Sequence, residues 1–229
     1  MLNTILINVF ALLLSFGIFA GHYTGKNSFD LAVFSKLISE HAIILIFLFI
    51  ISSVSLYLYN SDDRYNKRVK NKFSLSVFRL ISKFIHVTTI IIVSDSLLIS
   101  NFLGFEFHDN AFFTYIGIAI SSIAITLFIS SKITLGNNYS PCYDQRKPNN
   151  ITSSGLYRYI RHPIYSSNVL LLVGTFIISG SYLMLINILI LSLFYAVSAY
   201  REEKYLVNNF TYYKTYSKNT GMFIPRYKK

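Results

Sequence analysis

The sequence predicts an all-α membrane protein, a polytopic bundle of about six spans that ends in a helical hairpin. Of its 229 residues, 53% are hydrophobic and only 14% are charged, whereas a soluble domain carries about 25% charged residues. The apolar residues form long uncharged blocks, several of which reach the ~20 residues that a helix needs to cross ~30 Å of hydrocarbon. The basic residues gather between these blocks, as expected for membrane loops.

Six blocks are predicted to be transmembrane helices, at roughly 3–20, 41–59, 79–100, 112–131, 164–179 and 182–200. The first lacks a positively charged start and exceeds the ~7–15 apolar residues of a signal peptide, so we interpret it as a span. The last two are separated by Ser179-Gly180-Ser181. A turn this short predicts an antiparallel helical hairpin.

The distribution of charge predicts the topology. Eighteen of the 21 Lys and Arg residues lie in 60–79, 132–163 and 201–229, whereas the loop on the opposite side has Glu106, Asp109 and no basic residue. Because basic loops stay in the cytosol, both termini are predicted to be cytosolic. The net charge of +11 is expected to face anionic lipids, not nucleic acid. A composition rich in Ile, Asn, Lys and Tyr suggests an AT-rich bacterial genome and an inner-membrane location.

The chain is predicted to be one domain with two regions. Residues 1–131 hold the N-terminal spans, and residues 132–229 hold a cytosolic loop, the hairpin and a cytosolic tail. The single cysteine, Cys142, excludes an internal disulfide and a cysteine-based metal cluster, and no metal site is predicted. Asp95 and Asn187 lie within predicted spans and are expected to form interhelical hydrogen bonds.

The densest polar cluster occupies residues 155–165, where a loop enters the fifth span. Pro163 suits the first turn of a helix, because its missing N–H would be unpaired there anyway. The free N–H groups and positive end of that helix then face the interface. Arg158, Arg161 and His162 add charge or donors at the same place. The combination predicts a site for an anionic group such as a carboxylate.

The hairpin is expected to bring further charged residues to this cluster. Both of its helices rise about 1.5 Å per residue, so the end of the sixth span returns to the start of the fifth. Arg201, Glu202 and Glu203 should therefore lie at the same membrane face as Arg161 and His162. Two interpretations remain open. The glutamates can hold the amine or ribose hydroxyls of a cofactor, or the charges can form an interfacial salt-bridge network.

A series of motifs runs through residues 133–226 in a fixed order. They are Leu135-Gly136, Tyr139-Ser140-Pro141, Thr152-Ser153-x-Gly155-x-Tyr157-Arg158-Tyr159-x-Arg161-His162-Pro163-x-Tyr165, Glu202-Glu203-x-x-Leu206, Phe210, Tyr213-x-x-Tyr216 and Ile224-Pro225. This region, about 40% of the chain, resembles the isoprenylcysteine carboxyl methyltransferase family and its phospholipid methyltransferase relatives. Departures from the family pattern are Leu156 for proline, Ser167 for glycine, Tyr139 for tryptophan, and Phe210-Thr211 for Phe-Gly. They concern the packing of the tail and the substrate head group more than the cofactor.

The resemblance implies a membrane enzyme that uses S-adenosylmethionine, with its active site facing the cytosol. The expected cofactor-binding residues are Tyr157, Arg158, Arg161, His162, Pro163, Tyr165, Glu202 and Glu203. The C-terminal tail is expected to close over this pocket. The partners are expected to be membrane lipids and a lipophilic small molecule or prenylated substrate, and the oligomeric state stays open.

The acceptor of the methyl group decides which residues are catalytic. A carboxylate is already ionised and needs only positioning, for which Arg161 and Arg201 are the candidates. An amine needs a base, for which His162 and Glu203 are the candidates. We favour O-methylation of an isoprenylcysteine-like carboxylate. The alternatives are N-methylation of a phospholipid amine, an NADPH-dependent membrane reductase and a non-catalytic membrane protein.

Overall fold

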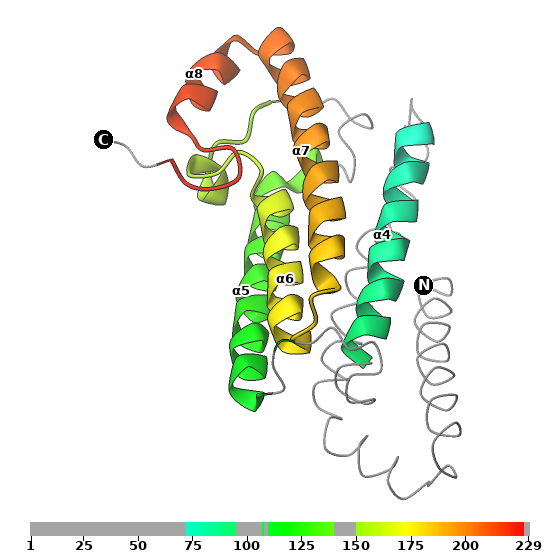
Figure 1. Cartoon of the computed structure of the whole chain (residues 1–229). Coiled ribbons are helices and arrows are strands. Elements are labelled where there is room, and N and C mark those ends of the chain that lie inside the picture. Colours follow the sequence, from blue (N-terminus) through cyan, green and yellow to red (C-terminus); the bar gives the residue numbers. More distant parts are fainter. Residues whose placement is uncertain (1–71, 95–106, 108–109, 140–149, 227–229) are drawn as a thin grey trace, which may run out of the picture.

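The computed structural model describes residues 72–94, 107, 110–139 and 150–226, and its regular elements there are all helical. In chain order they are α4 (Lys72–Ser94), α5 (Ala111–Leu135), the 3-10 turns η2 (Gly136–Asn138) and η3 (Gly155–Arg158), α6 (Pro163–Ser179), α7 (Met184–Asn209) and α8 (Thr211–Asn219). Figure 1 shows α5, α6 and α7 side by side, with α8 and η3 at one end of this bundle. The predicted all-α class is confirmed for these residues.

Two of the described helices are long and apolar enough to cross a membrane, Phe112–Leu135 of α5 and Met184–Asn209 of α7. Helix α6 is apolar but has only 17 residues. The predicted spans at 3–20 and 41–59 lie outside the described residues, and the span at 79–100 is described only as far as the end of α4. The expectation of about six spans is therefore not confirmed.

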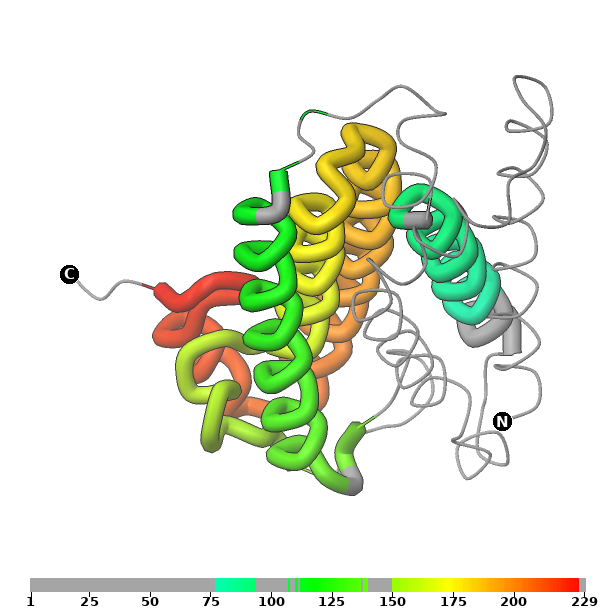
Figure 2. Tube along the Cα trace, turned by 90° about the horizontal axis from the view of Figure 1, so that it is seen from below, coloured from blue at the N-terminus to red at the C-terminus, as the bar shows by residue number. Residues whose placement is uncertain are grey.

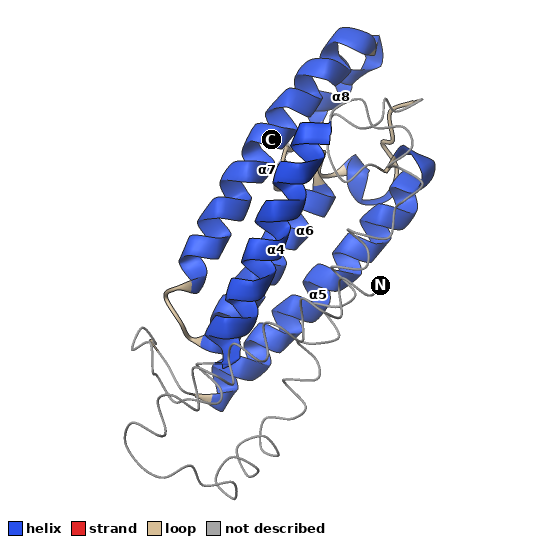
Figure 3. Ribbon diagram, turned by 90° about the vertical axis from the view of Figure 1, so that its right-hand side faces the viewer, coloured by secondary structure: helices blue, strands red, loops and turns tan. Residues whose placement is uncertain are grey.

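The predicted helical hairpin is present. Helix α6 ends at Ser179, and Gly180 follows in the left-handed conformation at φ 61°, which a residue without Cβ adopts without strain. Helices α6 and α7 then run antiparallel (Figure 3). Helix α7 continues to Asn209 and does not end near residue 200. Its last turns contain Arg, Glu, Lys and Leu, which are good helix formers and extend it beyond the apolar block.

Helices α5 and α6 approach each other at glycine. A Cβ added to Gly174 would lie 2.9 Å from the Gly117 carbonyl oxygen and 2.3 Å from Ser121 Oγ. Small residues let the two backbones touch, which is the usual way that helices pack closely in membranes. Figure 2 shows the two helices adjacent along their lengths. The region boundary predicted after residue 131 stays a prediction, but it falls inside α5.

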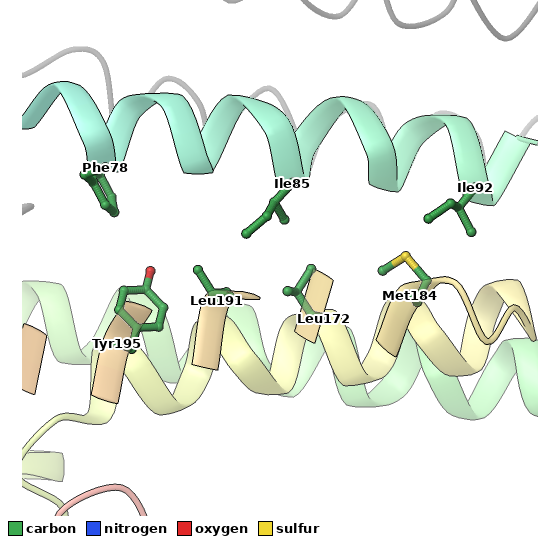
Figure 4. Close-up of a cluster of buried hydrophobic side chains, with 7 residues drawn as sticks. All are labelled: Phe78, Ile85, Ile92, Leu172, Met184, Leu191 and Tyr195. Carbon is green, nitrogen blue, oxygen red and sulfur yellow. The ribbon is translucent and has the colours of Figure 1, made fainter. Parts of the chain in front are cut away.

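Helix α4 packs against the hairpin through one apolar face. Three of its buried residues are spaced seven apart in sequence, which places them on the same side of a helix. Figure 4 shows them directed at side chains of α6 and α7; the buried cluster comprises Phe78, Ile85, Ile92, Leu172, Met184, Leu191 and Tyr195.

Polar contacts supplement this apolar face. The side chain of Asn187 accepts a hydrogen bond from Thr88 Oγ1 (3.0 Å) and lies 3.1 Å from Thr89 Oγ1. The predicted interhelical role of Asn187 is thus confirmed, whereas Asp95 lies outside the described residues.

Candidate functional site

The site is built around the residues that lead into α6. The helix begins at Pro163, as the sequence predicted, and His162 occupies the N-cap position. The His162 side chain makes no capping hydrogen bond, so its ring is available to contact α7. His162 is 6% exposed, and its ring lies between the two glutamates of α7 and an aromatic ring of α6.

Arg161 forms the shortest ion pair among the described residues of the site, with Glu203. Its Nε lies 2.7 Å from Glu203 Oε1 and its Nη2 3.2 Å from Oε2, a two-pronged geometry that is favourable for guanidinium and carboxylate. Its Nη1 donates to the carbonyl oxygens of Ser217 (2.8 Å) and Thr220. Arg161 therefore connects α7 to the end of α8.

His162 contacts both glutamates. Its Nε2 lies 3.2 Å from Glu203 Oε1 and its Nδ1 lies 3.6 Å from Glu202 Oε2. The ring stacks on Tyr165 with a centroid distance of 5.2 Å, and the Tyr165 hydroxyl donates to Glu202 Oε2 at 3.1 Å. Tyr165 also stacks on Tyr195 at 4.4 Å. The imidazole orientation is thus held by two carboxylates and a column of aromatic rings.

The structure brings together five of the residues predicted for the site: Arg161, His162, Tyr165, Glu202 and Glu203. The return of the two glutamates to the start of α6 is confirmed. The carboxylate expected there belongs to the chain itself, as Glu203. The salt-bridge network is therefore present, but the Glu202 side chain remains 35% exposed and accessible to a ligand.

The structure also places three further predicted residues, two of them exposed and one buried. Arg158 and Arg201 are exposed, Arg158 on η3 and Arg201 on α7. Tyr157 is buried, and its carbonyl oxygen accepts a hydrogen bond from the Tyr216 hydroxyl. Burial raises the pKa of Tyr216 to about 12, so this hydroxyl remains a donor at neutral pH.

The C-terminal tail lies alongside the chain that enters α6. The backbone N–H of Arg161 donates to the Gly221 carbonyl at 2.8 Å, and the backbone N–H of His162 donates to the Met222 carbonyl at 3.0 Å. These bonds arrange the two segments in parallel, next to a bridge between Ile160 and Gly221. The tail therefore covers the backbone of the cluster.

A cavity of about 500 Å³ adjoins the cluster on the α6 side. Its walls are apolar and aromatic, and Tyr165 belongs both to the cavity and to the cluster. The Ser166 hydroxyl in the first turn of α6 donates to the Phe223 carbonyl at 2.6 Å. This bond holds the tail, whose residues Phe223, Ile224 and Pro225 form one wall of the cavity.

Tyr213 of α8 is a polar residue of the site that the sequence analysis matched to a motif but did not assign. The residue is 2% exposed, and its hydroxyl has no hydrogen-bond partner in the part of the chain that the structure describes. Burial, followed by the charge of Glu203, raises the pKa of Tyr213 above its usual value. An unpaired buried hydroxyl costs about 1–3 kcal/mol, so a bound polar group would be favoured beside it.

Sequence reasoning could have found Tyr213 but not the tail contacts. The Tyr-x-x-Tyr spacing puts Tyr213 and Tyr216 on one face of a helix, and both are buried. Ser166 and Phe223 have no comparable signal, because their contact depends on where the tail returns.

The phospholipid methyltransferase family model matches residues 112–212. The matched segment runs from the start of α5 into the start of α8, so it includes the cluster but neither Tyr213 nor the tail. No curated protein matches the chain.

Proposed function

We propose that this protein is an integral membrane methyltransferase that uses S-adenosylmethionine and acts on a lipophilic substrate at the cytosolic face of the membrane. The observation that carries the proposal is the partly buried cluster of Arg161, His162, Glu202 and Glu203, which lies beside an apolar cavity. The match to the phospholipid methyltransferase family covers this cluster. The apolar lengths of α5 and α7 support a membrane location.

The residues present suit S-adenosylmethionine. The cavity volume of about 500 Å³ falls within the ~300–1,000 Å³ typical of small-molecule sites. The exposed part of Glu202, beside the cavity, suits an ammonium group or ribose hydroxyls. The apolar walls suit an aromatic base. When bound, the cofactor would supply an electrophilic methyl group on a sulfonium, and in-line attack of a nucleophile on that methyl would release S-adenosylhomocysteine.

Arg161 is best described as a positioning residue. Each of its three guanidinium nitrogens donates to Glu203 or to a carbonyl of α8 and the tail. It therefore fixes Glu203 and the end of α8, next to the tail that forms one wall of the cavity. Arg201 is the remaining candidate to position an acceptor carboxylate.

The candidate bases Glu203 and His162 already contact other side chains, which favours a methyl acceptor that needs no base. Both oxygens of Glu203 accept from Arg161, and both ring nitrogens of His162 face glutamates. We therefore propose O-methylation of an isoprenylcysteine-like carboxylate. N-methylation of a phospholipid amine is the second candidate, favoured by the description of the matched family. In that reaction the partly exposed Glu202 is the better base.

Ligand-dependent stability of the detergent-purified protein tests the cofactor. A ligand that binds only the folded state stabilises it by about 2.7 kcal/mol at a hundred times its Kd. We expect S-adenosylhomocysteine to raise the melting temperature and NADPH to leave it unchanged. Glu202→Gln should weaken S-adenosylhomocysteine about tenfold, whereas Lys204→Gln, an exposed neighbour on α7, should not. Stabilisation by NADPH alone would favour the reductase. If neither ligand stabilises the protein, the result would favour a non-catalytic protein.

Alkaline lability of the product tests the acceptor. The enzyme is incubated with S-adenosylmethionine that carries a labelled methyl group. Either farnesylcysteine or phosphatidylethanolamine is added as the acceptor. A carboxyl methyl ester releases volatile methanol in mild base, whereas an N-methyl group does not. Base-labile label from farnesylcysteine supports O-methylation, and base-stable label in phosphatidylethanolamine would replace it with N-methylation.

A further inference from the structure

A second recess, separate from the apolar cavity, lies between η3 and α8. Its volume is about 850 Å³, and Pro225 lines both spaces, so the recess and the cavity adjoin at the tail. None of the described residues that line the recess is acidic. Its polar side chains come from the loop before η3, from α8 and from the tail, and they include Ser153, Ser154, Arg158, Thr215, Asn219 and Arg226.

The two arginines give the recess a positive charge. No hydrogen bond or ion pair holds the Arg158 guanidinium to any residue that the structure describes, and the side chain is exposed. Arg226 donates from Nη1 to the Lys218 carbonyl, and most of its donors remain for other contacts. Two planar guanidinium groups with hydroxyl and amide neighbours suit a phosphate, which offers several acceptor oxygens.

The rim of the recess has the composition of a membrane surface. Tyr159 and Tyr212 line it and are 57% and 60% exposed. Lys214 and Lys218 are exposed on the same short helix, α8. Tyrosine concentrates at the level of lipid head groups, and basic residues beside a membrane attract anionic lipids. A lipid head group is therefore the source of phosphate that the surroundings favour.

We propose that this recess binds the phosphate of an anionic membrane lipid, through Arg158 and Arg226. The inference goes beyond the proposed methyl transfer and rests only on the membrane location, and it assigns Arg158 to lipid recognition and not to the cofactor pocket. Arg226 and Pro225 belong to the tail, so a bound phosphate would also hold the tail against η3. The lipid would thereby stabilise the wall shared with the cavity.

The test measures ligand-dependent melting temperatures of the full chain in neutral detergent. The probes are dioctanoyl-phosphatidylglycerol, dioctanoylglycerol with the same chains but no phosphate, and inorganic phosphate. We expect phosphatidylglycerol to stabilise the wild type and dioctanoylglycerol not to. The double variant R158Q/R226Q should bind phosphatidylglycerol at least tenfold more weakly. The control K83Q/K204Q removes the same charge from exposed sites on α4 and α7 and should bind as the wild type does.

The outcomes separate the alternatives. Stabilisation by phosphatidylglycerol well beyond that of inorganic phosphate supports the lipid, whereas stabilisation by inorganic phosphate alone would overturn it in favour of a soluble ligand. Equal binding by R158Q/R226Q and the wild type would refute the site. Loss of S-adenosylhomocysteine binding in that variant would also refute it, because the recess would then belong to the cofactor pocket. If the wild type binds phosphatidylglycerol but not S-adenosylhomocysteine, the methyltransferase proposal fails and the lipid site stands.

Discussion

The contact between α5 and α6 and the cluster around Arg161 are held together by opposite means. At Gly117 and Gly174 the two backbones touch, and the side chains beside them, Ser121 and Ile178, are uncharged. At Arg161 and Glu203 long side chains meet through directed, charge-assisted hydrogen bonds. The first contact tolerates no added atom, whereas the second tolerates no change of geometry. The helix pair is a scaffold, and the cluster is the part whose chemistry can serve a reaction.

The largest effect is expected from filling the helix contact. Gly174→Leu places atoms where the Gly117 carbonyl and Ser121 already lie, and the obstacle is mainly backbone that cannot rotate away. We expect the free energy of unfolding to fall by about 3 kcal/mol, or the protein not to fold. Ala119→Leu, at an exposed position of α5, is the matched control. Yield and melting temperature in detergent measure the effect, and a Gly174→Leu protein as stable as the control would contradict the close approach.

Breaking the ion pair should have an intermediate effect. Arg161→Gln removes the fork on Glu203 and leaves a carboxylate that is only 18% exposed without its main partner. We expect a loss of about 2 kcal/mol and faster proteolysis of the tail, because the bonds to Ser217 and Thr220 are lost as well. Arg161→Lys keeps the charge but not the planar fork, and it should recover only part of the loss.

A double-mutant cycle sharpens this prediction. If Arg161 acts through Glu203, the variants R161Q and E203Q should be coupled by roughly 1 kcal/mol or more. The cycle is measured by thermal or denaturant unfolding. Additive losses of stability in the double variant would show that the two side chains stabilise the protein independently.

The smallest effect is expected at the tail. Ser166→Ala removes the hydrogen bond to the Phe223 carbonyl and should cost about 1 kcal/mol, the usual worth of one such bond. The loss should appear mainly as faster amide exchange in residues 220–226, with α5 and α6 unchanged. Ser122→Ala is a matched control, since that hydroxyl donates to the Ile118 carbonyl within α5. Equal exchange in both variants would mean that Ser166 does not hold the tail.

Several parts of the fold follow from local sequence. The apolar composition of three blocks is sufficient to predict the helices α5, α6 and α7. The turn at Gly180 depends on one residue that tolerates a left-handed backbone. The start of α6 depends on Pro163. The fixed rise of two helices joined by a short turn was sufficient to return Glu202 and Glu203 to His162. Each of these features is set by neighbours in the chain or by regular geometry.

Only the tertiary structure determines that the side chains of Arg158 and Arg161 lie in different places. Arg158 and Arg161 are three residues apart in the same motif, yet Arg161 lies among Glu203, Ser217 and Thr220 while Arg158 faces the second recess. The segment between them is not a regular helix, so spacing does not determine where their side chains point. The direction is set by the tail, which pairs with residues 160–162 after sixty intervening residues. Composition and periodicity determine which helices form, but the contacts of a returning tail exist only once those helices have packed.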